Sequence, residues 1–114
     1  MQEILIGRPS WKNISAPLLD SMFALRHEMF AERLQWQVQS QHGKEKDWFD
    51  RLEPTYIVAR HPEDTRRATG SWRLLPTTGP YMLKDVFPEL LHGQAAPSDP
   101  TIWEASRFAV ARHE

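Results

Sequence analysis

The chain contains no cysteine, which excludes disulfide bonds, thiolate metal ligands and cysteine nucleophiles. It also lacks an apolar run close to the roughly 20 residues that a membrane-spanning helix needs. Residues 1–10 hold only a short apolar run with a glutamate in it, which is not the pattern of a signal peptide. We therefore expect a cytoplasmic protein with no membrane span.

Neither sign of charge is in clear excess. The formal net charge is −1, from 14 Lys and Arg against 15 Asp and Glu, and no polybasic run occurs, so nucleic acid is not an expected partner. Hydrophobic residues make up 40% and charged residues 25% of 114 residues. This balance is typical of one globular domain, which we place at 1–114.

The pattern of apolar residues and turn signals predicts the order β, α, β, β, short α, β. The expected elements are a strand at 3–7, a helix at 13–36 with Ser15 as N-cap, a long polar loop at 37–54, a hairpin of strands at 55–60 and 69–76, short helical pieces within 77–93 and a last strand at 101–114. This order predicts an α/β (α+β) domain with a mostly antiparallel sheet.

The last strand carries two charges among apolar neighbours, in the sequence WEASRFAV (103–110). Strict alternation puts Glu104 on one face with Ser106, and Arg107 on the opposite face. An unpaired buried ion costs several kcal/mol, so each charge needs a partner.

Four further charged residues extend this observation. Arginines stand inside otherwise apolar elements, and carboxylates stand nearby in the sequence KDWFD (46–50). Together they predict an ion-pair network that lines a pocket; its members are Arg26, Arg73, Arg107, Asp47, Asp50 and Glu104. The alternative is that the arginines lie at the surface with their stems along apolar side chains.

Other catalytic patterns are weak or missing. Ser106 does not lie in a G-x-S-x-G sequence, so a serine hydrolase is not indicated. The five histidines have scattered spacings and no known metal motif occurs, so no metal site is predicted. The KDWFD loop is then either a solvated acidic loop or one that folds over a cationic ligand.

Several segments together resemble one known family, the acyl-homoserine lactone synthases or autoinducer synthesis proteins. They are LRHEMFAERLQW, KDWFD, WRLLPTTGPYML, DVFPELL and WEASRFAV, and they span most of the chain. The near-invariant positions of the family fall on Arg26, Phe30, Trp36, Asp47, Asp50, Arg73, Phe87, Glu104, Ser106 and Arg107.

This resemblance implies a three-layer α-β-α sandwich like that of the N-acetyltransferases. It implies two substrates, S-adenosylmethionine and an acyl thioester on acyl carrier protein or coenzyme A, and no separate cofactor. The products would be an N-acyl-homoserine lactone for quorum sensing and methylthioadenosine. Family chains are considerably longer, so we expect 1–114 to be the N-terminal portion of one synthase domain, without the C-terminal half that completes the sheet and most of the acyl pocket.

The resemblance also implies roles for single residues. Glu104, Ser106 and Arg107 are the expected catalytic residues, with Glu104 as the general base that accepts a proton from the attacking amine. The expected S-adenosylmethionine site consists of Arg26, Phe30, Trp36, Asp47, Asp50 and Phe87, with Arg26 on the carboxylate and the two rings facing the sulfonium. Arg73 and Arg107 would pair with Asp47, Asp50 or Glu104 and order the KDWFD loop.

Two other functions stay open at this point. One is a different N-acyltransferase that uses an acyl-coenzyme A, supported by RRATGS (66–71), which weakly resembles the phosphate-binding loop of acetyltransferases. The other is a truncated binding module without turnover. Release of methylthioadenosine distinguishes the synthase from both. The acyl chain length, the donor and the oligomeric state do not follow from the sequence.

Overall fold

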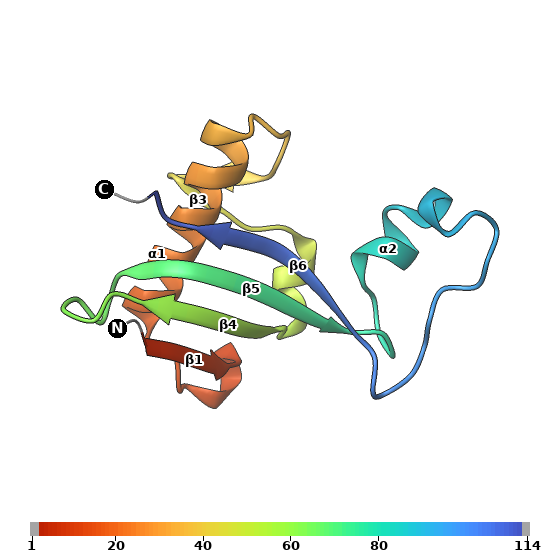
Figure 1. Ribbon diagram of the computed structural model, residues 1–114, viewed down its shortest axis with the longest axis horizontal. Helices are drawn as coiled ribbons and strands as arrows, with labels where there is room; N and C mark the ends of the chain where they lie inside the picture. Colours follow the sequence, from red (N-terminus) through yellow and green to blue (C-terminus); the bar gives the residue numbers. More distant parts are fainter. Residues whose placement is uncertain (1–2, 113–114) are drawn as a thin grey trace.

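A four-stranded sheet forms the centre of the molecule in the computed structural model, which describes residues 3–112. Its strands are β1 (Glu3–Gly7), β4 (Thr55–Arg60), β5 (Ala68–Pro76) and β6 (Trp103–Val110), and they lie in the order β1-β4-β5-β6 (Figure 1). Every pair is antiparallel. The predicted mixed α/β class with a mostly antiparallel sheet is confirmed.

Helix α1 (Ala16–Arg26) covers one face of the sheet (Figure 1). It begins where predicted, because the Ser15 hydroxyl accepts a hydrogen bond from the Leu18 N–H at 3.3 Å. Leu18 and Met22 are fully buried and pack in one core with Val58 of β4. Residues 3–112 thus supply one of the two helical layers of the expected sandwich.

The regular helix ends ten residues before the predicted end at Trp36. It continues as a π-helix, η2 (His27–Arg33), in which the Leu34 N–H binds the carbonyl of Met29, five residues back. Short π-helical segments are rare and frequently mark functional sites. Here the segment carries Phe30, which is buried.

The predicted polar loop at 37–54 contains structure of its own. A hairpin of β2 (Ser40–Gln41) and β3 (Lys44–Glu45) is followed by the 3₁₀ turn η3 (Trp48–Leu52). The turn begins with a reciprocal cap: Asp47 accepts from the Asp50 N–H at 3.3 Å, and Asp50 accepts from the Asp47 N–H at 2.8 Å. The KDWFD sequence therefore fixes both carboxylates locally.

Residues 78–101, which we call the strap, leave the sheet after β5 and return to it at β6 (Figure 1). The strap contains α2 (Met82–Asp85) and the 3₁₀ turn η4 (Pro88–Leu91). A further 3₁₀ turn, η1 (Pro9–Trp11), follows β1 near the N-terminus. Thr77 closes it at the base, because its hydroxyl contacts the carbonyls of Asp99 and Ile102 at 2.9 and 2.8 Å.

A β-bulge interrupts β6 and overturns the expectation that its two charges lie on opposite faces. Arg73 of β5 faces Ser106 and Ser71 faces Ala109, so two residues of β6 stand opposite the single Trp72. Arg107 lies in this bulge with φ of 53°. The extra residue shifts the alternation by one, which brings the Arg107 side chain to the side of Ser106 and exchanges the faces of the residues after it.

Candidate functional site

Three arginines and three carboxylates close into a ring of alternating charge on the helix-covered side of the sheet. The contacts run from Arg26 to Glu45 (2.9 Å), Glu45 to Arg107 (3.0 Å), Arg107 to Asp47 (3.2 Å), Asp47 to Arg73, Arg73 to Asp50 (3.4 Å) and Asp50 back to Arg26 (2.8 Å). Each side chain in this ring has two partners of opposite charge. We call it the charged ring.

The charged ring is buried and electrically balanced. Arg26 and Arg73 are each 1% exposed and Glu45 is 0% exposed. Burial by itself raises the pKa of Asp50, but the hydrogen bond from Arg26 and the charges of Arg26 and Arg73 hold that pKa well below its usual value. Burial lowers the pKa of Arg26, and its bonds to Asp50 and Glu45 more than offset that effect. Asp50 is thus held ionised by its partners.

The ring joins five parts of the chain, because α1, β3, the η3 turn, β5 and the β6 bulge each contribute to it. The expected ion pairs of Arg73 and Arg107 with Asp47, and of Arg73 with Asp50, are present. Glu45 is a member that the sequence interpretation missed. The signal was its spacing, since a residue two positions before Asp47 in extended backbone points to the same side.

Arg26 does not have the free guanidinium that we expected for a substrate carboxylate. Its Nε donates to Glu45, and its Nη1 and Nη2 donate to both oxygens of Asp50 at 2.8 and 2.9 Å. These three contacts make Arg26 a member of the charged ring, and its assignment to the S-adenosylmethionine carboxylate stays a prediction.

The Asp50 carboxylate has one more partner, the hydroxyl of Tyr56, which donates to Oδ1 at 2.7 Å. Burial raises the pKa of Tyr56, and the neighbouring Asp50 charge raises it further. The tyrosine therefore stays neutral and continues to donate its hydrogen bond.

Two aromatic side chains extend from the ring to the surface. The Arg107 guanidinium lies 5.5 Å from the centre of the Phe30 ring, and Phe30 stacks on Trp36 at 5.1 Å with 20° between the planes. Phe30 is 3% exposed and Trp36 is 53% exposed. The Trp36 face thus offers a π surface to solvent next to the charged ring.

The three expected catalytic residues differ in their surroundings. Ser106 Oγ accepts from Arg73 Nε at 3.0 Å, which ties it to the charged ring. Glu104 forms no ion pair with an arginine of residues 3–112. Instead its two oxygens accept from the backbone N–H groups of Met82 and Leu83, at 2.9 and 2.8 Å.

Phe87 is the one expected site residue that the structure leaves apart from this arrangement. It lies on the strap and is 43% exposed. Within residues 3–112, no ring contact or ion pair joins it to the charged ring. Its assignment to the S-adenosylmethionine site stays a prediction.

The carboxylates of the ring could in principle hold a cation, because oxygens of Glu45, Asp47 and Asp50 lie within 4.8 Å of one another. The three guanidinium groups already balance their charge. A metal ion at this place would be repelled by the arginines unless it displaced them. The arrangement is therefore suited to ion pairs and not to a metal.

A family model described as autoinducer synthase matches residues 11–114. The chain belongs to the autoinducer synthase family. It is 44% identical to the acyl-homoserine-lactone synthase of Aliivibrio fischeri over 110 residues, which is 96% of this chain and 56% of the relative. It is 48% identical over 107 residues to the synthase of Pseudomonas aeruginosa, which covers 94% of this chain and 52% of the relative.

Solved structures of the family agree with this assignment. The crystal structure of the AHL synthase LasI superposes with a TM-score of 0.88 at 42% identity, over 100% of this chain and 55% of that chain. The CoA-dependent acyl-homoserine lactone synthase BjaI, solved with SAM and isopentyl-CoA, gives a TM-score of 0.86 at 35% identity, over 98% of this chain and 52% of that chain. The chain therefore spans about half the length of the relatives it matches.

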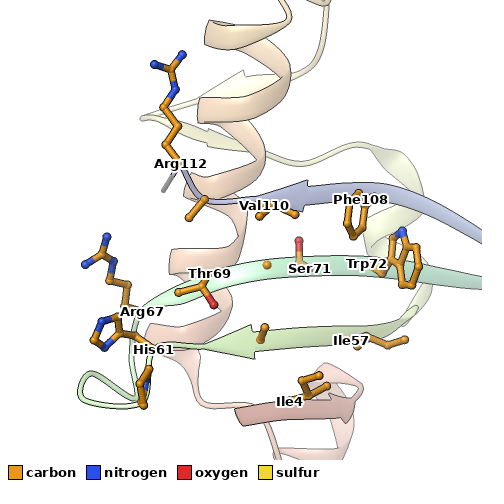
Figure 2. A pocket seen from close by; sticks show the side chains of 14 residues that line it. Ile4, Ile57, His61, Arg67, Thr69, Ser71, Trp72, Phe108, Val110 and Arg112 are labelled. Atoms are coloured by element: carbon orange, nitrogen blue, oxygen red, sulfur yellow. The ribbon is translucent and has the colours of Figure 1, made fainter. Parts of the chain in front are cut away.

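On the face of the sheet opposite α1, the chain carries an apolar trough of about 750 Å³ (Figure 2). Trp72 and Phe108 lie side by side at one end of it, with ring centres 4.8 Å apart, while His61, Arg67 and Arg112 lie at the other end. Phe108 faces this side because of the β6 bulge.

The helices of residues 3–112 include none that is long and apolar enough to cross a membrane.

Proposed function

We propose that this chain is the N-terminal portion of an acyl-homoserine lactone synthase. The enzyme would transfer an acyl group from a thioester to the amine of S-adenosylmethionine, and then close the lactone with release of methylthioadenosine. The observation that carries the proposal is the charged ring bound to the β6 bulge through Arg107, in a chain that belongs to the autoinducer synthase family.

The surface beside the ring supports S-adenosylmethionine as one substrate. Its sulfonium is a cation, and cations are attracted to the faces of aromatic rings. Trp36 is half exposed and stacks on the buried Phe30, so the indole of Trp36 is held in place before the ligand binds. The structure of BjaI with SAM and isopentyl-CoA supports this substrate for a member of the family.

The charged ring has a positioning role in this proposal. Lactone formation requires the carboxylate of the ligand to reach its own γ-carbon, which is a matter of holding a folded conformation. A ring of paired charges fixes Arg107 and Ser106 because each of them is bonded to a neighbour that is itself held in place. Few rearrangements are then needed when the substrate binds.

The face opposite α1 is where the second helical layer of the sandwich is expected to pack, so we assign the exposed Trp72 and Phe108 side chains on it to the interface with the C-terminal half rather than to the acyl chain. We propose an acyl carrier protein as the donor, in the cytoplasm, with acyl-coenzyme A as the alternative because BjaI is CoA-dependent.

A product assay on the complete gene product tests the function. S-adenosylmethionine is supplied with a mixed pool of acyl carrier proteins and, separately, with acyl-coenzyme A, and the products are analysed by mass spectrometry. Methylthioadenosine together with an N-acyl-homoserine lactone is the expected result, and the mass of the lactone gives the acyl chain. An N-acylated product without methylthioadenosine would indicate the other N-acyltransferase, and no product from either donor would contradict catalysis.

A further inference from the structure

Glu104 occupies a position that a helix cap normally fills. The first N–H groups of a helix have no acceptor within the helix, and a Ser, Thr, Asp or Asn at the N-cap usually provides one. Helix α2 has Tyr81 at its N-cap, and the Tyr81 side chain forms no capping bond. The acceptor comes instead from β6, where the two oxygens of Glu104 bind the N–H groups of Met82 and Leu83.

Met82, whose N–H donates to Glu104, also contacts the charged ring through its side chain. The Met82 thioether sulfur lies 3.2 Å from Nη2 of Arg73 and 4.0 Å from Nη1 of Arg107. Met82 and Leu83 also pack against the small core of Phe49, Leu75 and Tyr81. The start of α2 is thus the part of the strap that lies against the site.

Beyond α2 the strap has a different character. Val86, Phe87 and Leu90 are 43–62% exposed. The strap is attached at its base by Thr77 and across its middle by the Tyr81 hydroxyl, which donates to the carbonyl of Pro97. The two bonds from Glu104 are the side-chain contacts that fix its first helical turn to β6.

We infer that Glu104 is a positioning residue, which attaches α2 to β6 and thereby holds the Met82 thioether against the guanidinium groups of Arg73 and Arg107. This role is distinct from the general base that the sequence predicted. Each Glu104 oxygen keeps a lone pair after it accepts one N–H, so the two hydrogen bonds fix the carboxylate against α2 without by themselves preventing proton transfer. The catalytic part of this inference rests on the proposed synthase function; the attachment does not.

Amide hydrogen exchange tests the attachment without any assay of activity. The complete gene product is compared with Glu104→Ala and Glu104→Gln, and the exchange of the Met82 and Leu83 amides is followed by NMR. We expect at least about tenfold faster exchange in the alanine variant, since charge-assisted bonds are lost. The glutamine variant should be intermediate, because its side-chain oxygen can still accept one N–H. Unchanged protection in both variants would overturn the inference.

A matched control is available on the same strap. Glu89 is exposed, so Glu89→Gln removes the same charge from the same segment without a bond to α2 and should leave both amides as they are. If Glu104→Ala does not fold, the glutamine variant, which preserves the size of the side chain, provides the comparison.

The pH dependence of turnover separates positioning from proton transfer. A positioning role predicts that Glu104→Gln retains a rate between those of the wild type and Glu104→Ala, with the acid limb of the kcat/KM profile unmoved. If Glu104 is the base, both variants should be equally inactive and any residual rate should lose that limb, which would overturn the inference. Absence of methylthioadenosine from the wild type would contradict the synthase function, and the amide exchange would still decide the attachment.

Discussion

Replacing Glu45 by glutamine perturbs the charged ring at the residue that is most deeply buried. Glu45 Oε1 accepts from the Nε atoms of Arg26 and Arg107, at 2.9 and 3.0 Å, and the side chain is 0% exposed. Glutamine has nearly the same volume, so no cavity forms. The change removes one negative charge and leaves the ring with an uncompensated positive charge in a buried environment.

The expected loss of stability is about 3 kcal/mol. Removal of one partner from a buried ion pair typically costs about 3–5 kcal/mol, and the lower end applies because both hydrogen bonds go to Oε1 and the glutamine oxygen can still accept them. The two hydrogen bonds keep their charged donors but lose the negative charge of the acceptor, which accounts for much of this loss. A difference of this size changes the ratio of folded to unfolded protein by more than about a hundredfold.

Urea unfolding followed by tryptophan fluorescence measures this difference on the complete gene product. The midpoint should fall while the slope stays the same, which identifies a change in stability alone. Glu63→Gln, at an exposed position in the turn between β4 and β5, is the control and should shift stability by no more than about 0.5 kcal/mol. A Glu45→Gln loss as small as that of the control would refute the argument that the ring is a coupled buried network.

Three further predictions concern acid, alkali and the face of the sheet opposite α1. The pKa of Asp50 is lower in the folded state than in the unfolded chain, so on acidification the unfolded chain binds this proton first. The free energy of unfolding should therefore fall as the pH drops below about 4. In urea titrations, Asp50→Asn should lack the contribution of Asp50 to this fall. The pKa of Tyr56 is raised, so stability should fall above about pH 10, and an equally steep fall in Tyr56→Phe would contradict this assignment. In the complete gene product, Trp72→Ala should lower the free energy of unfolding by about 3 kcal/mol because the second helical layer buries this side chain, and a loss below about 0.5 kcal/mol would contradict that packing.

Local signals in the sequence predicted the elements that depend on neighbouring residues. Ser15 indicated the start of α1, and the alternation in 55–60 and 69–76 indicated the central hairpin. The predicted end of the helix at Trp36 was wrong because no local signal in the sequence marked the change from α-helical to π-helical hydrogen bonds at His27–Arg33. The hairpin at Ser40–Glu45 was missed because its strands are two residues long and mostly polar.

The candidate site shows the same division. Arginines in apolar segments, together with the two aspartates of KDWFD, were enough to predict buried ion pairs, because a buried guanidinium requires an acidic partner. Which acid pairs with which arginine depended on residues far apart in the chain, such as Glu45 and Arg107, and no local pattern specifies them.

The sequence by itself determined the class of fold, the resemblance to the synthases and the need for an ion-pair network. Only the tertiary structure decided the geometry of β6. One extra residue opposite Trp72 placed Arg107 in the charged ring and directed Phe108 to the trough. The path of the strap gave Glu104 two backbone N–H groups in place of an arginine. The physical reason is that the faces of a strand follow from its register with the neighbouring strand, and a bulge changes that register without leaving a pattern in the sequence.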